Sequence, residues 1–142
     1  MDRFCLESEN FRLLLDFRVF EEDISYPSNT TLKVSVFSEG FSATTDMDID
    51  VKQMFGFCEN LQTIYDSLRG EAKISEAYGK QYLSFSCDRH GHIFISGYLY
   101  SCGINGFRHT MEFENVLDQS FLPSFMKDLA AFSKRYNSIN RK

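Results

Sequence analysis

The sequence predicts an α+β fold: one curved, antiparallel β-sheet of about seven strands with two amphipathic helices packed on it, in the order βββαββββα. In most segments apolar residues alternate with polar ones, which is the period of a half-buried strand. Over 51–68 and 122–136 they recur at helical spacing instead. Because no linker or repeat interrupts the pattern, residues 1–142 are expected to form a single domain with its own core.

Three strands are predicted before the first helix. The segment 10–20 alternates so that one face is apolar, and a loop over 21–30 with an acidic start follows it. The next two strands are predicted at 32–36 and 41–49, separated by a glycine-containing turn. These segments supply the first part of the predicted sheet.

The first helix has the clearest local signals. Asp50 is the predicted N-cap, and Gln53 stands at the position that completes a capping box. Gly70 is predicted to end the helix, since glycine accepts left-handed backbone geometry. The face predicted to be buried consists of Val51, Met54, Phe55, Cys58, Leu61, Tyr65 and Leu68.

Four further strands and a closing helix complete the prediction. The strands are expected at 72–77, 82–87, 92–100 and 107–113, and their short connections favour an antiparallel meander. The closing helix is predicted to begin at Ser120. Its buried face is predicted to consist of Leu122, Phe125, Met126, Leu129, Phe132 and Tyr136.

Composition argues against several classes of function. Fifteen basic and twenty acidic residues give a net charge of -5, which opposes binding to the phosphates of nucleic acid. No glycine-rich phosphate-binding motif occurs, so no nucleotide cofactor is expected. The four cysteines form no CxxC pair, and the chain has neither an apolar signal core nor eighteen consecutive apolar residues. A soluble cytoplasmic protein without membrane contact is therefore expected.

Histidines give only weak indications of chemistry. Cys87, His90 and His92 are close in sequence, but they lie within one predicted hairpin, where tetrahedral metal coordination is unfavourable. We interpret them as turn residues and expect no metal site. His109 alternates with apolar neighbours and is predicted to be a half-buried strand residue. No catalytic residue is assigned, and the protein is not expected to be an enzyme.

Acidic residues are the stronger candidates for function. Asp46, Asp48 and Asp50 occupy every second position, which places them on one side of an extended segment. The glycine and glutamate of a calcium-binding loop are missing from this segment. The group is either a solvated acidic face or a docking surface for a basic partner.

Several phrases of the sequence resemble those of a known family. They are Phe11-Arg-Leu, Tyr26-Pro27, Leu32-Lys-Val-Ser-Val, the helix from Val51 and the run from Phe113 to Leu122. Together they resemble the WapI-type immunity proteins of bacterial polymorphic toxin systems. The resemblance covers nearly the whole chain. It implies a small cytoplasmic protein that binds and neutralises the toxic domain of a cognate effector without catalysis. For the chain itself we expect a monomer or a weak homodimer.

The partner-binding residues expected from this reading are acidic or aromatic. Asp46 and Asp48 would attract a basic toxin, and exposed aromatic side chains would anchor it. The full set is Phe20, Glu21, Glu22, Asp23, Tyr26, Asp46, Asp48 and Tyr78.

Two other functions remain open at this level. One is a ligand-binding or enzymatic domain with a pocket between the sheet and a helix, in which His109 is a polar group. The other is a structural module that dimerises through Leu14 and Phe20.

Overall fold

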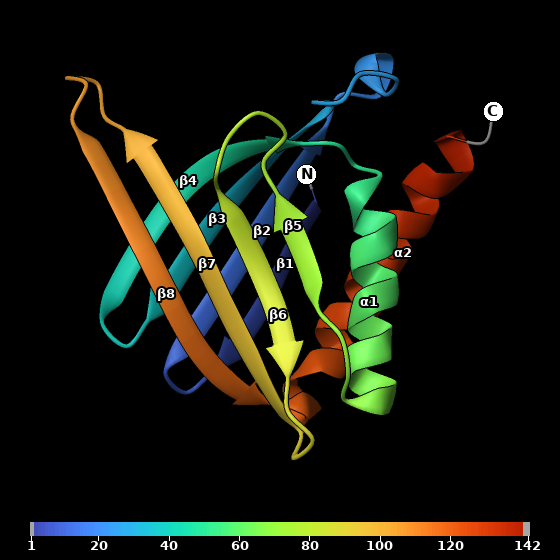
Figure 1. Cartoon of the computed structure of the whole chain (residues 1–142). Coiled ribbons are helices and arrows are strands. Elements are labelled where there is room, and N and C mark those ends of the chain that lie inside the picture. Colours follow the sequence, from blue (N-terminus) through green and yellow to red (C-terminus); the bar gives the residue numbers. More distant parts are fainter. Residues whose placement is uncertain (1, 141–142) are drawn as a thin grey trace.

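The computed structural model describes residues 2–140 and contains two antiparallel sheets and two long helices (Figure 1). The first sheet, sheet A, has the order β1-β2-β3-β4, and the second, sheet B, has the order β5-β6-β7-β8. The strands are β1 (Asp2–Ser8), β2 (Phe11–Val19), β3 (Thr30–Ser38), β4 (Phe41–Ile49), β5 (Ala72–Ser75), β6 (Tyr82–Cys87), β7 (His92–Cys102) and β8 (Arg108–Asp118). The helices are α1 (Gln53–Ser67) and α2 (Leu122–Asn140), and two short 3-10 helices are η1 (Glu21–Asp23) and η2 (Gln119–Phe121).

The prediction of an α+β fold is confirmed, but the prediction of one seven-stranded sheet is wrong. Each sheet is a four-stranded antiparallel meander, and α1 carries the chain from sheet A to sheet B. Strand alternation shows which face of a segment is buried, but it does not show which strands pair across an intervening helix. Strand β1 was also not predicted. It pairs along its length with β2, from Asp2 opposite Phe17 to Ser8 opposite Phe11.

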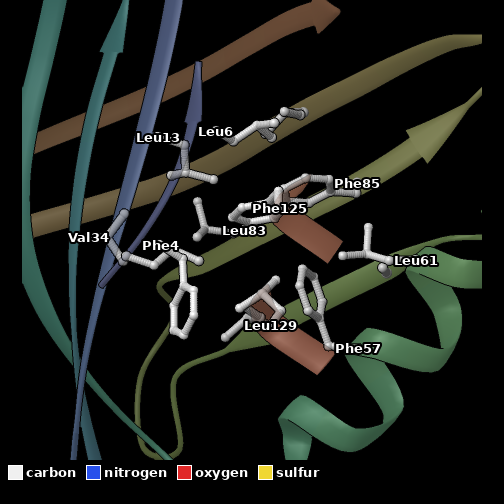
Figure 2. Close-up of a cluster of buried hydrophobic side chains, with 14 of the residues drawn as sticks. Phe4, Leu6, Leu13, Val34, Phe57, Leu61, Leu83, Phe85, Phe125 and Leu129 are labelled. Atoms are coloured by element: carbon white, nitrogen blue, oxygen red, sulfur yellow. The ribbon is translucent and has the colours of Figure 1, made fainter. Parts of the chain in front are cut away.

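The core lies between the two sheets and the two helices, which close one side of the molecule (Figures 1 and 2). Figure 2 shows Phe4 and Leu13 of sheet A facing Phe85 of sheet B, with Phe57 of α1 and Phe125 of α2 beside them. Phenylalanine rings meet repeatedly in this core, and the T-shaped pair of Phe57 and Phe85 has a centroid distance of 5.5 Å. Eight of the fifteen phenylalanines are buried, and their rings supply much of the packing in the interior.

Helix α1 starts and ends differently from the prediction. The Asp50 carboxylate accepts a hydrogen bond from Lys52 N at 2.9 Å, so it stabilises the turn before the helix. Gln53 forms no capping box, because its side chain exchanges two hydrogen bonds with the backbone of Ser75 in β5. The helix ends at Ser67, Leu68 caps it with a left-handed φ of 53°, and Gly70 follows with a φ of 91°.

Helix α2 follows the prediction closely. Asp118 caps the preceding 3-10 turn by accepting a hydrogen bond from Ser120 N at 3.0 Å. Leu122, Phe125, Leu129, Phe132 and Tyr136 are all buried, as their spacing predicts. The helix runs along β1, where Arg135 pairs with Asp2 at 3.2 Å. No helix in the part of the chain that the structure describes is long and apolar enough to cross a membrane.

Candidate partner-binding surface

Asp46 and Asp48 lie on the outer face of β4, and both side chains are exposed. Met47 and Ile49 alternate with them and are buried in the core, which fixes the outward direction of the two carboxylates. Asp50 does not continue this row, because its carboxylate accepts hydrogen bonds from Asn29 Nδ2 at 3.1 Å and Lys52 N at 2.9 Å. The predicted row of three aspartates is therefore a pair of solvent-facing carboxylates followed by a structural one.

The loop between β2 and β3 is held at the same end of sheet A by one buried side chain. Asn29 donates hydrogen bonds to the carbonyl oxygens of Ile24 and Tyr26, both at 3.0 Å. Its own Oδ1 accepts a hydrogen bond from Val51 N at 2.9 Å. The loop is thereby tied to the segment that enters α1. These hydrogen bonds position the acidic turn Glu21–Asp23, which is preceded by Phe20 and followed by Tyr26.

The loop between β5 and β6 packs against β4 from the other side. Ala77 N donates to Asp48 O at 2.8 Å, and Gln81 Nε2 donates to Asp46 O at 3.0 Å. These bonds satisfy outward-facing backbone groups in the second half of the β4 edge. They also place Tyr78, whose side chain is 80% exposed, next to the two aspartates.

The structure therefore brings the predicted partner-binding residues to one end of the molecule, where both loops lie at the top in Figure 1. We call this surface the acidic end. It consists of Phe20, Glu21, Glu22, Asp23, Tyr26, Asp46, Asp48 and Tyr78. The five carboxylates are exposed, and the aromatic side chains of Phe20 and Tyr26 are 38% and 61% exposed. Such a combination offers a negative field together with rigid apolar contact area.

Asp88 and the histidines of the β6–β7 turn form a local hydrogen-bond network. His92 Nδ1 lies 2.8 Å from Asp88 Oδ2, and Asp88 Oδ1 accepts hydrogen bonds from the backbone N–H groups of His90 and His92. Burial alone would raise the pKa of Asp88, but these bonds outweigh it and lower the pKa to about 2. Within residues 2–140, no three His, Cys, Asp or Glu side chains are grouped so that they could hold a metal ion.

His109 lies in a groove between the two sheets. The groove has a volume of about 430 Å³ and is lined mainly by small and hydroxyl-bearing residues of β4, β7 and β8, among them Thr44, Leu99 and Thr110. It lies between strands, so its position differs from the predicted pocket between a sheet and a helix. His109 is exposed, whereas the sequence predicted a half-buried side chain.

The proposed dimer residues Leu14 and Phe20 do not form one patch. Leu14 is half-buried in the middle of β2, between Cys5 and Ser35 in the sheet register. Phe20 follows the end of that strand and is covered on one side by the guanidinium of Arg18, at 5.1 Å from its ring centroid. Six residues of extended chain separate the two side chains by roughly 20 Å.

Sequence reasoning did not single out the outer face of sheet B. This surface, which we call the tyrosine face, carries half-exposed Tyr82, Phe94, Tyr98 and Tyr100, with serines between them. The Lys73 ammonium lies 4.5 Å from the ring centroid of Tyr82, and the Arg108 guanidinium lies 4.8 Å from that of Tyr100. Tyr and Arg are enriched at protein interfaces. The available sequence signal was the alternation of tyrosine and serine on the outward positions of β6 and β7.

The fold and the acidic end together define a small α+β protein with two antiparallel sheets and a charged surface bearing exposed aromatic side chains. The chain belongs to the immunity protein WapI-like family, which matches residues 7–137. Immunity is therefore its general function, a toxin is the general kind of partner, and members of such a family are generally non-catalytic. A comparison with curated proteins gives no match.

Proposed function

We propose that the protein binds the toxic domain of a cognate bacterial effector in the cytoplasm and neutralises it by covering its active site, without catalysis. Membership of the immunity protein family supports this general function. The net charge of -5 favours a basic partner, since opposite net charges accelerate association.

The acidic end is the surface that we assign to the toxin. One observation carries this assignment: two loops that are distant in sequence converge on the end of β4, next to exposed Asp46 and Asp48. The carboxylates would steer a cationic toxin towards this end and then lie at the rim of the contact. Binding would occlude cationic residues of the toxin that contact its substrate.

The aromatic side chains of the acidic end would supply most of the binding free energy. Tyr26 and Tyr78 are 61% and 80% exposed, although both are large and partly apolar. A stable interface buries about 1,600 Å², and a few central aromatic residues usually dominate its energetics. Each tyrosine also carries a hydroxyl group that can pair with a polar atom of the toxin.

Co-expression with the toxin domain encoded beside this gene tests the function itself. The intact protein should restore growth of cells that produce the toxin and should co-purify with it in a fixed stoichiometry. Continued killing without a complex would contradict the immunity function towards that toxin.

Matched tyrosine variants test the assigned surface separately. Tyr26→Ala and Tyr78→Ala should each weaken toxin binding by roughly tenfold or more, as expected for interface anchors. Tyr98→Ala is the control, because Tyr98 lies on the tyrosine face of sheet B. If only Tyr98→Ala weakens binding, the toxin binds sheet B and the assignment to the acidic end is wrong, whereas the immunity function stands.

A small-ligand site is the second candidate function, and the groove beside His109 is the observation that favours it. Its hydroxyl-bearing lining could bind a polar molecule. A screen of small polar metabolites by nuclear magnetic resonance would test this function. Shifts confined to the groove and lost in His109→Ala would support it, and an absence of shifts there would count against it.

A further inference from the structure

Strand β8 has an open edge over Arg108–Glu114, whereas β1, β5 and the second half of β4 lie against or bond to other parts of the chain. The edge of β1 lies beside α2, and β5 is bonded to Gln53 of α1. The second half of β4 is bonded to the β5–β6 loop. Within the described chain, no backbone partner occupies the outer side of β8 between Arg108 and Glu114. Open edges of this kind are sites for pairing with another strand.

The hairpin register shows which backbone groups point to this open edge. Gly103 N donates to Phe107 O at 2.9 Å, and hydrogen-bonded pairs alternate along an antiparallel ladder. The pairing of β7 with β8 therefore uses the odd-numbered residues of β8, whereas Thr110, Glu112 and Glu114 direct their N–H and C=O groups outward. Val116 marks the limit of the open stretch, because its N–H donates to Asn115 Oδ1 at 2.7 Å.

The charges along this edge are self-complementary. Arg108 stands at one end of the stretch, and Glu112 and Glu114 stand at the other, all exposed. Neither glutamate forms an ion pair with any residue in 2–140. Charges on an edge strand commonly prevent pairing, but antiparallel pairing of this edge with its own copy would place opposite charges across from each other.

Opposite charges face each other only in certain registers of two antiparallel β8 edges. A two-fold axis at Thr110 places Arg108 opposite Glu112 of the second copy, and an axis at Met111 places it opposite Glu114. An axis at Glu112 would place that carboxylate opposite its own copy and is unfavourable. In the single chain the Arg108 side chain lies over β7, where it donates to the Tyr98 hydroxyl at 3.2 Å and its guanidinium is 4.8 Å from the Tyr100 ring centroid, so it has to turn towards the edge to pair with a second copy.

Apolar residues at the two ends of the hairpin are complementary as well. Ile104 at the tip is fully exposed, and Phe107 next to it is 70% exposed. At the opposite end of β8, Val116 is 46% exposed. Antiparallel pairing would bring the tip of one copy alongside Val116 of the other and would remove apolar surface from water.

We propose that two copies of this chain associate through antiparallel pairing of their β8 edges, with Arg108 of each copy opposite Glu112 or Glu114 of the other. The two copies of sheet B then form one continuous eight-stranded sheet. This dimer is isologous, since the same edge is used by both copies. The proposal does not depend on the identity of the toxin or on the surface that binds it.

Charge variants of the full-length chain test the proposal by sedimentation over a range of concentrations. The unaltered protein should reach a mass twice its 16.5 kDa, whereas Arg108→Glu and the double variant Glu112→Arg/Glu114→Arg should each remain monomeric. Mixing these two variants should restore a dimer that contains one copy of each, because every charge then faces its opposite. Circular dichroism confirms that each variant is folded.

A backbone variant provides an independent test. Thr110→Pro removes an N–H that points away from β7, so the fold should persist while the dimer is lost. Thr110→Val keeps this N–H and should keep the dimer. The proposal is overturned if the unaltered protein stays monomeric, if the mixed charge variants do not associate, or if the dimer survives Thr110→Pro.

Discussion

Asn29 is the single side chain on which the shape of the acidic end depends most. It is fully buried, and its amide bonds two carbonyl groups of its own loop together with Asp50 and the backbone of Val51. A buried side-chain amide destabilises the folded state unless its donor and acceptor atoms are hydrogen-bonded. In Asn29 both the Nδ2 and the Oδ1 atoms have partners. The loop that carries Phe20 and Tyr26 is thus positioned by a residue that itself makes no contact with solvent.

Cys58 shows how burial controls the reactivity of a residue. Loss of hydration raises the pKa of its thiol from 9.0 to about 11, with a smaller raising effect from the charge of Glu59, and a hydrogen bond with Ser133 opposes the change. We expect Cys58 to have about 100-fold less thiolate than an ordinary cysteine near neutral pH. Alkylation with iodoacetamide followed by peptide mass mapping should label exposed Cys5 and Cys102 long before Cys58. Equal labelling rates would show that Cys58 is accessible and ionised.

The lowered pKa of the Asp88 carboxylate leads us to expect that the stability of the fold depends on pH. Burial would raise the pKa of Asp88, but the hydrogen bonds that it accepts from His92 and His90 outweigh burial and lower the pKa from 3.8 to about 2. A lowered pKa in the folded state stabilises the protein above pH 3.8, and this contribution is lost as the pH falls towards 2. Urea unfolding of Asp88→Asn should therefore show a smaller loss of stability over this range than the unaltered protein. The same acid dependence in both proteins would contradict this role.

At the scale of elements, the positions of both helices were predictable, but the buried face of α1 was only partly so. Periodicity identified Met54 and Leu61, yet it missed Phe57 and Ile64, which are also buried. The reason is that α1 is packed against α2 on one side and against β5 and β6 on the other. A helix between two neighbours buries a wider arc than a single apolar stripe.

Paired substitutions in α1 test this arrangement. Phe57→Ala should lower the free energy of unfolding by about 3–5 kcal/mol, because it removes a buried ring that contacts Phe85. Phe55→Ala should cause a clearly smaller loss, since Phe55 is only half-buried. Urea denaturation of both variants measures the difference. A larger loss for Phe55→Ala would show that α1 is rotated relative to this packing.

At the scale of the whole molecule, sequence patterns identified the strand faces but not the division into two sheets. The pairing of β1 with β2 and the transfer from β4 to β5 through α1 depend on contacts between distant segments. Those contacts have no signature in local periodicity. The β5–β6 loop was similarly unpredictable, because only the folded chain places Ala77 against Asp48.

The sequence indicated which residues the candidate surface contains, but not where in the fold they lie together. Carboxylates and aromatic side chains in loops indicated a docking role for Asp46, Asp48 and Tyr78, and the structure gathers them at the acidic end. The tyrosine face was missed because its residues belong to two strands, β6 and β7, and their common surface exists only when these strands pair in sheet B. Residue type thus indicates what a surface can bind, whereas topology decides where that surface is.

The rate of association with the toxin domain encoded beside this gene tests the acidic end most directly, measured at several salt concentrations. Asp46→Asn/Asp48→Asn removes two exposed carboxylates, and Asp66→Asn/Asp128→Asn is the control with the same change in charge on the helices. We predict that the first variant associates more slowly than the control and shows a flatter dependence on salt. Equal association rates and equal salt dependence for the two variants would contradict the assignment of the toxin-binding surface to the acidic end.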